Sequence, residues 1–402
     1  MLRRRLGWWR AFVGTGTWGG RDKQAVSATR SPTTATGRKY MRLLHIADVH
    51  LEHSFPWLGP DRGRERRLAL RSTLRKVVDL ARERNVDALC IAGDLFDREN
   101  AVPSVGEFLR ATFATLGDLP VLISPGNHDY YSTGGPYDQV AWSPNVHIFR
   151  APTATSVSIG SGAIWGNAFT SPETHTSPLV GFPRPTTGTN IALFHADLIE
   201  PNGTSPYGPI TVAELDAAGF RFAMLGHVHA GRTDEARRFA YPGSLEPLDV
   251  TEVGPRSALL IEASDGNLRV ESIPVASRRV ICDEIDLSPF TTLADLKRFV
   301  ATKASAWDHS DVRLRLVGTL GGELDDPQLV RSVFRDLDVV LDFVAEPSVD
   351  ISALTDQRTT LGAFVRDAVA RRKAATNEQQ ARFWSDVLRV GVAAFRGKQV
   401  TL

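Results

Sequence analysis

Residues 41–50 read MRLLHIADVH, an apolar run that ends on Asp48 and His50. Further apolar runs of the same kind lie downstream, at Ala88–Ala92, Val121–Ser124, Ile191–His195 and Arg221–Leu225. Between the first two runs, residues 64–84 carry apolar side chains mostly three and four positions apart, which predicts a helix. Near-continuous apolar strands that alternate with helices are typical of a layered α/β domain with a buried sheet.

Polar residues stand at the predicted carboxyl ends of these five strands. They are Asp48 and His50; Gly93, Asp94 and Asp97; Gly126, Asn127, His128 and Asp129; His195; and Gly226, His227 and His229. In open α/β sheets, ligands collect at the carboxyl ends of the strands, so these separate motifs can converge on one site. The glycines allow sharp turns and a close approach of the backbone to a ligand.

The side chains in these motifs suit a pair of metal ions. Imidazole, carboxylate and amide oxygen bind manganese, iron or zinc, and one aspartate can bridge two ions about 3.5–4 Å apart. The absence of a thiol from the set argues against a structural zinc site. Each motif alone also has an ordinary structural interpretation, such as a helix cap, a turn or a core histidine. Their joint occurrence at successive strand ends favours the metal site.

Charge is distributed unevenly along the chain. Residues 1–40 hold nine of the 47 lysines and arginines and one of the 46 acidic residues. The remainder therefore has 38 basic against 45 acidic residues, a net charge of −7, which offers no bulk attraction to nucleic acid. We expect residues 1–40 to be a disordered tail or the result of a start placed too early, with a transit peptide as a weaker alternative.

The remaining composition indicates a soluble protein. There is no apolar run long enough for a membrane span, so no membrane association is expected. Cys90 and Cys282 both lie in apolar, strand-like runs, and we expect both to be buried in a reducing, cytoplasmic setting.

The ordered set of motifs resembles the calcineurin-like metallophosphoesterase superfamily over residues 41–245. Three segments resemble its SbcD-type DNA repair exonuclease branch: LLHIADVHLEHSFP (43–56), GDLFDRENAVPS (93–104) and YPGSLEP (241–247). The serine/threonine phosphatase branch usually continues GDxxDRG, whereas Glu99 and Asn100 follow Arg98 here. The family fold is a β-sandwich flanked by helices, which agrees with the layered α/β interpretation.

The resemblance also implies a role for each motif residue. It implies two divalent metals, with Mn²⁺ expected: one bound by Asp48, His50 and His229, the other by Asn127, His195 and His227, and both bridged by Asp94. His128 would orient or protonate the leaving-group oxygen. Asp97 and Asp129 would hold imidazoles in place. His53 lies close to these motifs in sequence, and a surface role is expected for it.

The chain is predicted to have four parts: the tail (1–40), the catalytic domain (41–276), a small α/β domain (277–350) and C-terminal helices (351–402). Asp265-Gly266 predicts the hairpin that closes the catalytic domain. The small domain resembles the capping domain of the nuclease branch, which contributes to DNA placement. Such nucleases usually work with a coiled-coil ABC-type ATPase, so that partner is expected. A homodimer is left open.

The expected function is a Mn²⁺-dependent DNA exonuclease that acts in repair. The first alternative is a phosphodiesterase or phosphatase acting on small molecules or phosphoproteins, which the net charge of −7 favours. The second is a non-catalytic regulatory module on the same fold. The intact ligand set speaks against this last alternative, because a degenerate enzyme would tend to lose ligands.

Overall fold

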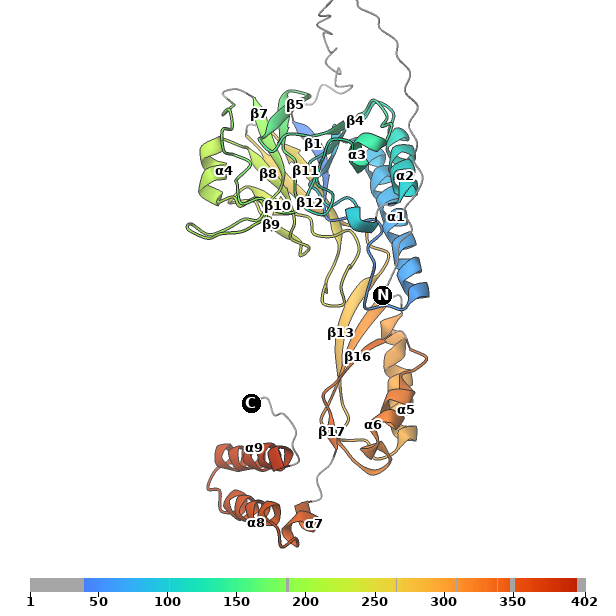
Figure 1. The fold of residues 1–402 in the computed structure, drawn as a ribbon, viewed down its shortest axis with the longest axis vertical. Helices are drawn as coiled ribbons and strands as arrows, with labels where there is room; N and C mark the ends of the chain where they lie inside the picture. The colour runs from blue at the N-terminus through green and yellow to red at the C-terminus, as the bar shows by residue number, and fades with distance from the viewer. Residues whose placement is uncertain are drawn as a thin grey trace, which may run out of the picture.

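The computed structural model describes residues 40–100, 102–185, 188–264, 266–308, 310–337, 339–347 and 351–395 of the chain. Apart from Tyr40, the predicted tail lies outside these residues. Two six-stranded sheets pack face to face in the larger part of the molecule (Figure 1). The first comprises, in spatial order, β12 (Leu268–Pro274), β11 (Ser257–Ala263), β1 (Met41–Ile46), β2 (Ala88–Ile91), β3 (Val121–Ile123) and β4 (Val146–Ile148). The second comprises β5 (Thr155–Ile159), β6 (Gly162–Gly166), β7 (Thr189–His195), β8 (Phe222–Gly226), β10 (Phe239–Tyr241) and β9 (Arg232–Asp234).

Both sheets have a parallel centre. Strands β1 to β4 run parallel, and β11 and β12 form the predicted antiparallel hairpin beside β1. In the second sheet β6, β7, β8 and β10 run parallel, with β5 and β9 antiparallel at the edges. All five strands predicted from the sequence are present, and their ends differ from the prediction by at most two residues.

Successive side chains along a strand point to opposite faces of the sheet, and this alternation produces the layers. On β1, Leu44 and Ile46 face the helices, whereas Leu43 packs between the two sheets. Helices α1 (Pro60–Glu83) and α2 (Pro103–Ala114) cover the first sheet, and α4 (Val212–Ala218) covers the second (Figure 1). Helix α1 starts earlier than predicted, because Pro60 is preorganised for the first helical position. The predicted layered sandwich flanked by helices is confirmed. Two short helical segments, η1 (Arg98–Asn100) and α3 (Pro136–Gln139), complete this part.

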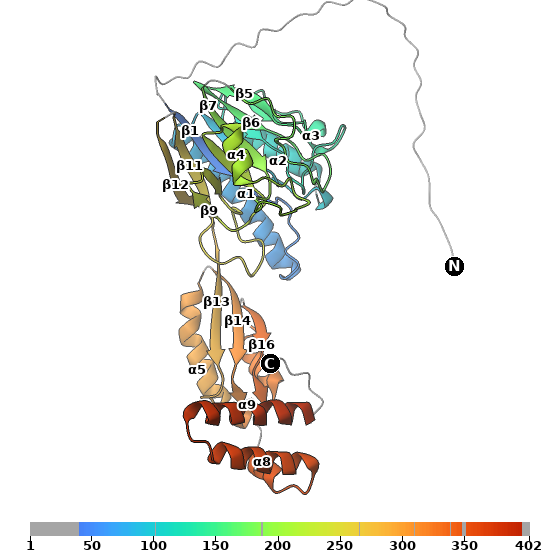
Figure 2. The ribbon, with the colours of Figure 1, turned by 90° about the vertical axis from the view of Figure 1, so that its left-hand side faces the viewer.

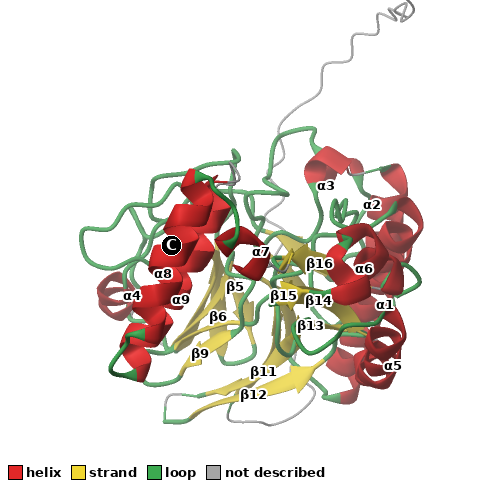
Figure 3. Ribbon diagram, turned by 90° about the horizontal axis from the view of Figure 1, so that it is seen from below, coloured by secondary structure: helices red, strands yellow, loops and turns green. Residues whose placement is uncertain are grey.

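A small α/β unit follows. Its sheet has the order β13 (Arg279–Asp286), β14 (Ser310–Val317), β16 (Val339–Phe343), all parallel. Helices α5 (Leu293–Ala304) and α6 (Pro327–Val333) lie on one side of it (Figure 3). The short elements are η2 (Ser305–Trp307), β15 (Thr319–Leu320), η3 (Gly322–Asp325) and β17 (Glu346–Pro347). Cys90 is buried as expected, but the expectation for Cys282 is wrong: it is exposed, because it shares the uncovered face of β13 with Glu284.

A buried aspartate links this unit to the larger one. Asp311 on β14 is 1% exposed, and three arginines approach its carboxylate. They are Arg62 (3.4 Å) and Arg66 (3.6 Å) of α1, and Arg278 (3.4 Å). The division of the chain into domains after residues 40, 276 and 350 stays a prediction.

The C-terminal elements are α7 (Ile351–Thr355), α8 (Thr360–Lys373) and α9 (Glu378–Phe395). Helices α8 and α9 lie side by side and share an apolar cluster (Figure 2). Gly391 lets the helices approach closely, because a Cβ at this position would collide with the ring of Phe364. Within the described residues, no helix combines the length and the apolar character needed to cross a membrane.

Candidate metal centre

The predicted site residues come together at one edge of the sandwich. The ends of β1, β2 and β3 are level, since Ile46 pairs with Ile91 and Ile91 pairs with Ile123. In the second sheet, His195 at the end of β7 pairs with Gly226 at the end of β8. Both sheets therefore deliver the carboxyl ends of parallel strands to the same place.

Local backbone conformation turns the side chains inward. Asp48, His50 and Asp94 have φ values of 50°, 46° and 50°, and His227 has 102°, in the left-handed region that non-glycine residues rarely adopt. Such conformations persist only where the surroundings hold them. Two backbone hydrogen bonds between the loops after β1 and β2 hold these residues in place. The N–H of Asp48 donates to the carbonyl of Gly93 (3.1 Å), and the N–H of His50 donates to the carbonyl of Asp94 (2.9 Å).

Gly126, in the motif that follows β3, is required by packing. A Cβ on Gly126 would collide with the carboxylate of Asp94, so only glycine lets the loop after β3 lie against that side chain.

Two carboxylates lie at the centre of the cluster. Asp48 is fully buried and Asp94 is 2% exposed, and burial raises the pKa of both. Asp48 accepts hydrogen bonds from the backbone N–H of His227 (3.1 and 3.2 Å), and Asp94 accepts one from that of His128 (2.8 Å). The other oxygen of Asp94 lies 3.5 Å from Nε2 of His50 and 3.4 Å from Nε2 of His195. Buried anions so placed are stabilised by a cation between them.

Hydrogen bonds of the imidazoles leave one ring nitrogen of each facing this centre. In three of the rings, Nδ1 contacts an oxygen acceptor. His50 contacts Asp97 (2.5 Å), His195 contacts the carbonyl of Ala92 (2.9 Å), and His229 contacts Glu252 (2.7 Å). Because an oxygen that only accepts requires a proton on Nδ1, Nε2 of each neutral ring presents a lone pair.

Two of these lone pairs indicate that a cation belongs between the side chains. Nε2 of His50 is buried without a hydrogen-bond partner. Nε2 of His195 lies 2.9 Å from Oδ1 of Asn127, so that two acceptors face each other. A metal ion bound by both atoms would resolve this opposition, and the residues therefore fit the expected metals.

The charge states of the imidazoles agree with metal binding. Burial lowers the pKa of His195 and of His227 to about 4, so both rings are neutral at pH 7, the form that binds metals. For His229, burial opposes protonation, but the bond to Glu252 and the charge of Asp48 raise its pKa to about 9. This ring therefore lies in surroundings that attract positive charge.

Two of the groups of mutually close ligand atoms among the described residues contain Asp48. Asp48, His50 and His229 form one group; Asp48, Asp94 and His195 form another. His227 joins the second through His195, with ring centroids 5.3 Å apart. The first group is the set predicted for one metal, and the second contains the predicted bridge.

The remaining predicted residues surround these groups. Asp97 contacts His50, as expected, and also His53 (3.0 Å). Burial acts to raise the pKa of Asp97, but the bonds to the two imidazoles outweigh it and hold this pKa well below the usual range. The side chain of His128 is 52% exposed, with its ring 4.8 Å from that of His50.

Asp129 does not hold an imidazole, and that part of the prediction is wrong. Its carboxylate accepts hydrogen bonds from the backbone N–H groups of Asp94, Leu95 and Gly126 and from the hydroxyl of Tyr137. These donors occupy both oxygens, so Asp129 fixes the two loops that follow β2 and β3.

Comparison with known proteins agrees with this geometry. Residues 41–231 match the family Calcineurin-like phosphoesterase. These residues form a calcineurin-like phosphoesterase domain. The predicted family is thereby confirmed.

Relatives of the chain include three curated proteins. The uncharacterized metallophosphoesterase YhaO of Bacillus subtilis (strain 168) is 27% identical over 245 residues, 58% of this chain and 59% of the relative. The DNA double-strand break repair protein Mre11 of Aeropyrum pernix is 29% identical over 270 residues, 61% of this chain and 64% of the relative. A component of the nuclease SbcCD of B. subtilis is 25% identical over 122 residues, 30% of each chain. The chain thus spans less than two thirds of each relative, and these relatives are consistent with the predicted DNA repair exonuclease branch.

Two residues near the centre, Glu252 and Tyr207, escaped the sequence analysis, and a third, His53, was expected to have only a surface role. Glu252 holds His229 and also accepts from the hydroxyl of Ser244 (2.9 Å). His53 contacts Asp97 rather than lying free on the surface. Its position three residues after His50 was the sequence feature that could have indicated this contact. Tyr207 lies against His227. Glu252 and Tyr207 lie in irregular loops, where no strand-end pattern marks them.

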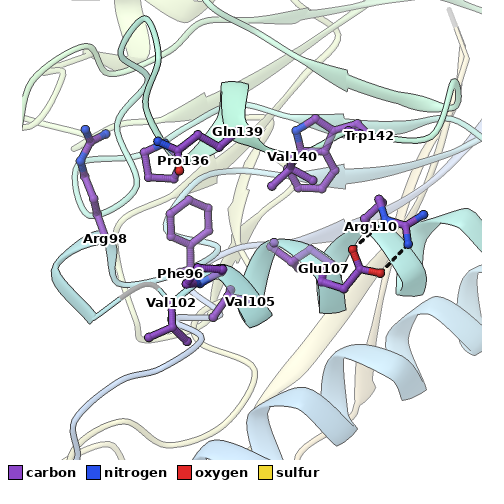
Figure 4. A pocket seen from close by; sticks show the side chains of 14 residues that line it. Phe96, Arg98, Val102, Val105, Glu107, Arg110, Pro136, Gln139, Val140 and Trp142 are labelled. Carbon is purple, nitrogen blue, oxygen red and sulfur yellow. Dashed lines mark hydrogen bonds and ion pairs between the residues drawn. The ribbon is translucent and has the colours of Figure 1, made fainter. Parts of the chain in front are cut away.

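A separate cavity of about 400 Å³ lies beside the centre, between α2 and the segment after α3 (Figure 4). Apolar side chains such as Phe96, Val140 and Trp142 line it, with Arg98 at one end and the Glu107–Arg110 ion pair at the other. None of the predicted metal ligands lines it, so the candidate chemistry lies elsewhere.

Proposed function

We propose that this chain is a Mn²⁺-dependent DNA exonuclease that acts in DNA repair together with a coiled-coil ABC-type ATPase. The observation that carries the proposal is the pair of ligand groups that share Asp48, with the unpartnered Nε2 of His50 and the opposed acceptors of His195 and Asn127. The names of the Mre11 and SbcCD relatives support DNA as the substrate and repair as the setting.

Each residue then has a proposed task. Asp48, His50 and His229 would hold one metal, Asn127, His195 and His227 would hold the other, and Asp94 would contribute to both. The chemistry that such a metal pair would supply is activation of a water molecule and neutralisation of phosphoryl charge. Asp97 and Glu252 fix the rings of His50 and His229 through Nδ1. His128 faces solvent beside His50, where its ring can donate a proton to the departing oxygen.

A phosphodiesterase or phosphatase with small-molecule or phosphoprotein substrates is the second candidate. The net charge of −7 over residues 41–402 favours it, because the body of the protein offers no general attraction to a polyanion.

One set of assays separates the two candidates. The Mn²⁺-loaded protein is incubated with end-labelled single- and double-stranded DNA, bis-p-nitrophenyl phosphate and p-nitrophenyl phosphate. Progressive release of nucleotides from DNA ends, with little hydrolysis of the monoester, is expected of the exonuclease. Turnover of the small esters without any cleavage of DNA would refute it in favour of the second candidate. Asp94→Ala serves as the inactive control.

A further inference from the structure

Tyr207 lies beside the candidate centre, in the segment between β7 and α4. Its ring rests on the imidazole of His227, with centroids 4.5 Å apart and planes inclined at 37°. The ring of His195 also lies beside His227 and is nearly perpendicular to it. Tyr207 therefore borders the half of the centre proposed to contain Asn127, His195 and His227.

The backbone around Tyr207 is held on both sides. Its carbonyl accepts from the N–H of Asp197 (2.9 Å), and its own N–H donates to the hydroxyl of Ser205 (3.1 Å). The next residue, Gly208, donates to the carbonyl of Thr174 (2.9 Å) and has a φ of 57°, which glycine adopts without strain. These bonds fix the backbone at Tyr207, and the ring itself contacts His227.

The hydroxyl groups of the neighbouring tyrosines behave differently. Tyr241 is buried and bonds through its hydroxyl to Leu198 and Ala196, and Tyr137 is buried and donates to Asp129. Tyr207 is only half-buried, and its hydroxyl has no hydrogen bond within the described part of the chain. Because Tyr207 is only half-buried, part of its side chain is available for contact with a ligand.

We propose that Tyr207 is a stacking platform for the nucleobase next to the phosphate that is bound at the centre. The proposal rests on the proposed function, because it takes the substrate to be a nucleotide chain. Stacking on an aromatic side chain strengthens binding by about 5- to 150-fold per base. It tolerates every sequence, since all bases have a π-face, which suits an enzyme that degrades DNA from its ends.

The test compares ligands with and without a base. Inhibition constants are measured for deoxyadenosine 5′- and 3′-monophosphate and for the corresponding base-free deoxyribose phosphates, against hydrolysis of bis-p-nitrophenyl phosphate by the Mn²⁺-loaded full chain. For one of the two phosphate positions, the nucleotide is expected to bind about 5- to 150-fold more tightly than its base-free counterpart. In Tyr207→Ala this ratio should fall to about 1, whereas Tyr207→Phe, which keeps the ring, should retain it.

Two controls make the outcome specific. Phe383→Ala removes a 59%-exposed aromatic ring on α9 and should leave the ratio unchanged. Metal content is measured for every variant. If Tyr207→Ala keeps the wild-type ratio, or if the wild-type ratio is about 1 at both phosphate positions, the platform does not exist. If Tyr207→Ala loses metal and weakens all four ligands equally, Tyr207 only supports His227, and the proposal is also wrong.

Failure of the proposed nuclease function would be visible separately. Absence of cleavage of DNA oligonucleotides refutes the exonuclease, whereas the ratio of inhibition constants still decides whether Tyr207 binds a base.

Discussion

Replacing His128 with asparagine separates a role in chemistry from a role in metal binding. The imidazole is 52% exposed, and its Nδ1 lies 3.6 Å from Asp97, beyond hydrogen-bond distance. Its backbone N–H donates to Asp94, a bond that the substitution leaves in place. His50 also keeps its own bond to Asp97. We therefore expect an intact fold, a change in stability of no more than about 0.5 kcal/mol, and close to two bound metals.

The loss should appear in turnover. Donation of a proton to a leaving group contributes about 10²–10⁴-fold in rate, which corresponds to about 3–5 kcal/mol in the activation barrier. The deficit of His128→Asn should approach this range on DNA, whose leaving alkoxide needs a proton. It should be much smaller on bis-p-nitrophenyl phosphate, because p-nitrophenolate departs without protonation.

The structure also offers a competing role for this residue, since His50, Asp94 and His128 form a group that could hold a metal. Elemental analysis, measured beside turnover on both substrates, decides between the two roles. Asp94→Ala is the reference, because loss of the bridge should remove metal and activity together. If His128→Asn loses metal to the same extent, then His128 is a ligand and the division of roles proposed above is wrong.

Three further predictions concern the centre and the C-terminal helices. Glu252→Gln should weaken metal affinity by about 10–100-fold, because the carboxylate that fixes Nδ1 of His229 is lost; calorimetric titration with Mn²⁺ measures this, and an unchanged affinity would show that Glu252 is dispensable. Chelation should abolish activity and Mn²⁺ should restore it far better than Mg²⁺, which prefers carboxylate and water to imidazole; full activity in Mg²⁺ alone would contradict this. If the C-terminal helices dock the proposed ATPase partner, deletion of residues 356–402 should spare hydrolysis of bis-p-nitrophenyl phosphate and abolish co-purification with that partner, because α9 exposes Phe383 and Phe395; joint loss of activity and solubility would instead show that the helices belong to the fold of the chain.

The sequence was sufficient to predict the strands that carry the centre. Each ends on a motif, and buried parallel strands are the clearest apolar runs in the chain. The sequence could not assign partners to Asp129 and Glu252. Asp129 follows Asn127 and His128 in one turn, where neighbouring side chains diverge, and its partners depend on how the loop after β2 folds over it. Glu252 reaches His229 from a loop beyond β10, a pairing that only the tertiary fold creates.

Exposure of Cys282 was missed for a related reason. An apolar run shows that a segment is a strand, but the choice between one covered face and two depends on the helices packed against the sheet. In the small unit α5 and α6 cover a single face, so alternate residues of β13 remain in solvent.

Both sheets contribute to the centre. Asp48 and Asp94 follow strands of the first sheet, whereas His195 ends β7 and His229 follows β8 of the second. A metal ion bound by residues of both sheets would link the two layers of the sandwich, and it would bind only to the folded arrangement in which the layers are packed together. Its binding free energy is then added to the resistance of the whole domain to unfolding, by about 2.7 kcal/mol at a free metal concentration of 100 times Kd. Removal of the metal would accordingly shorten the lifetime of the protein as well as abolish its activity. Proteases should degrade the metal-free form faster than the metal-bound form.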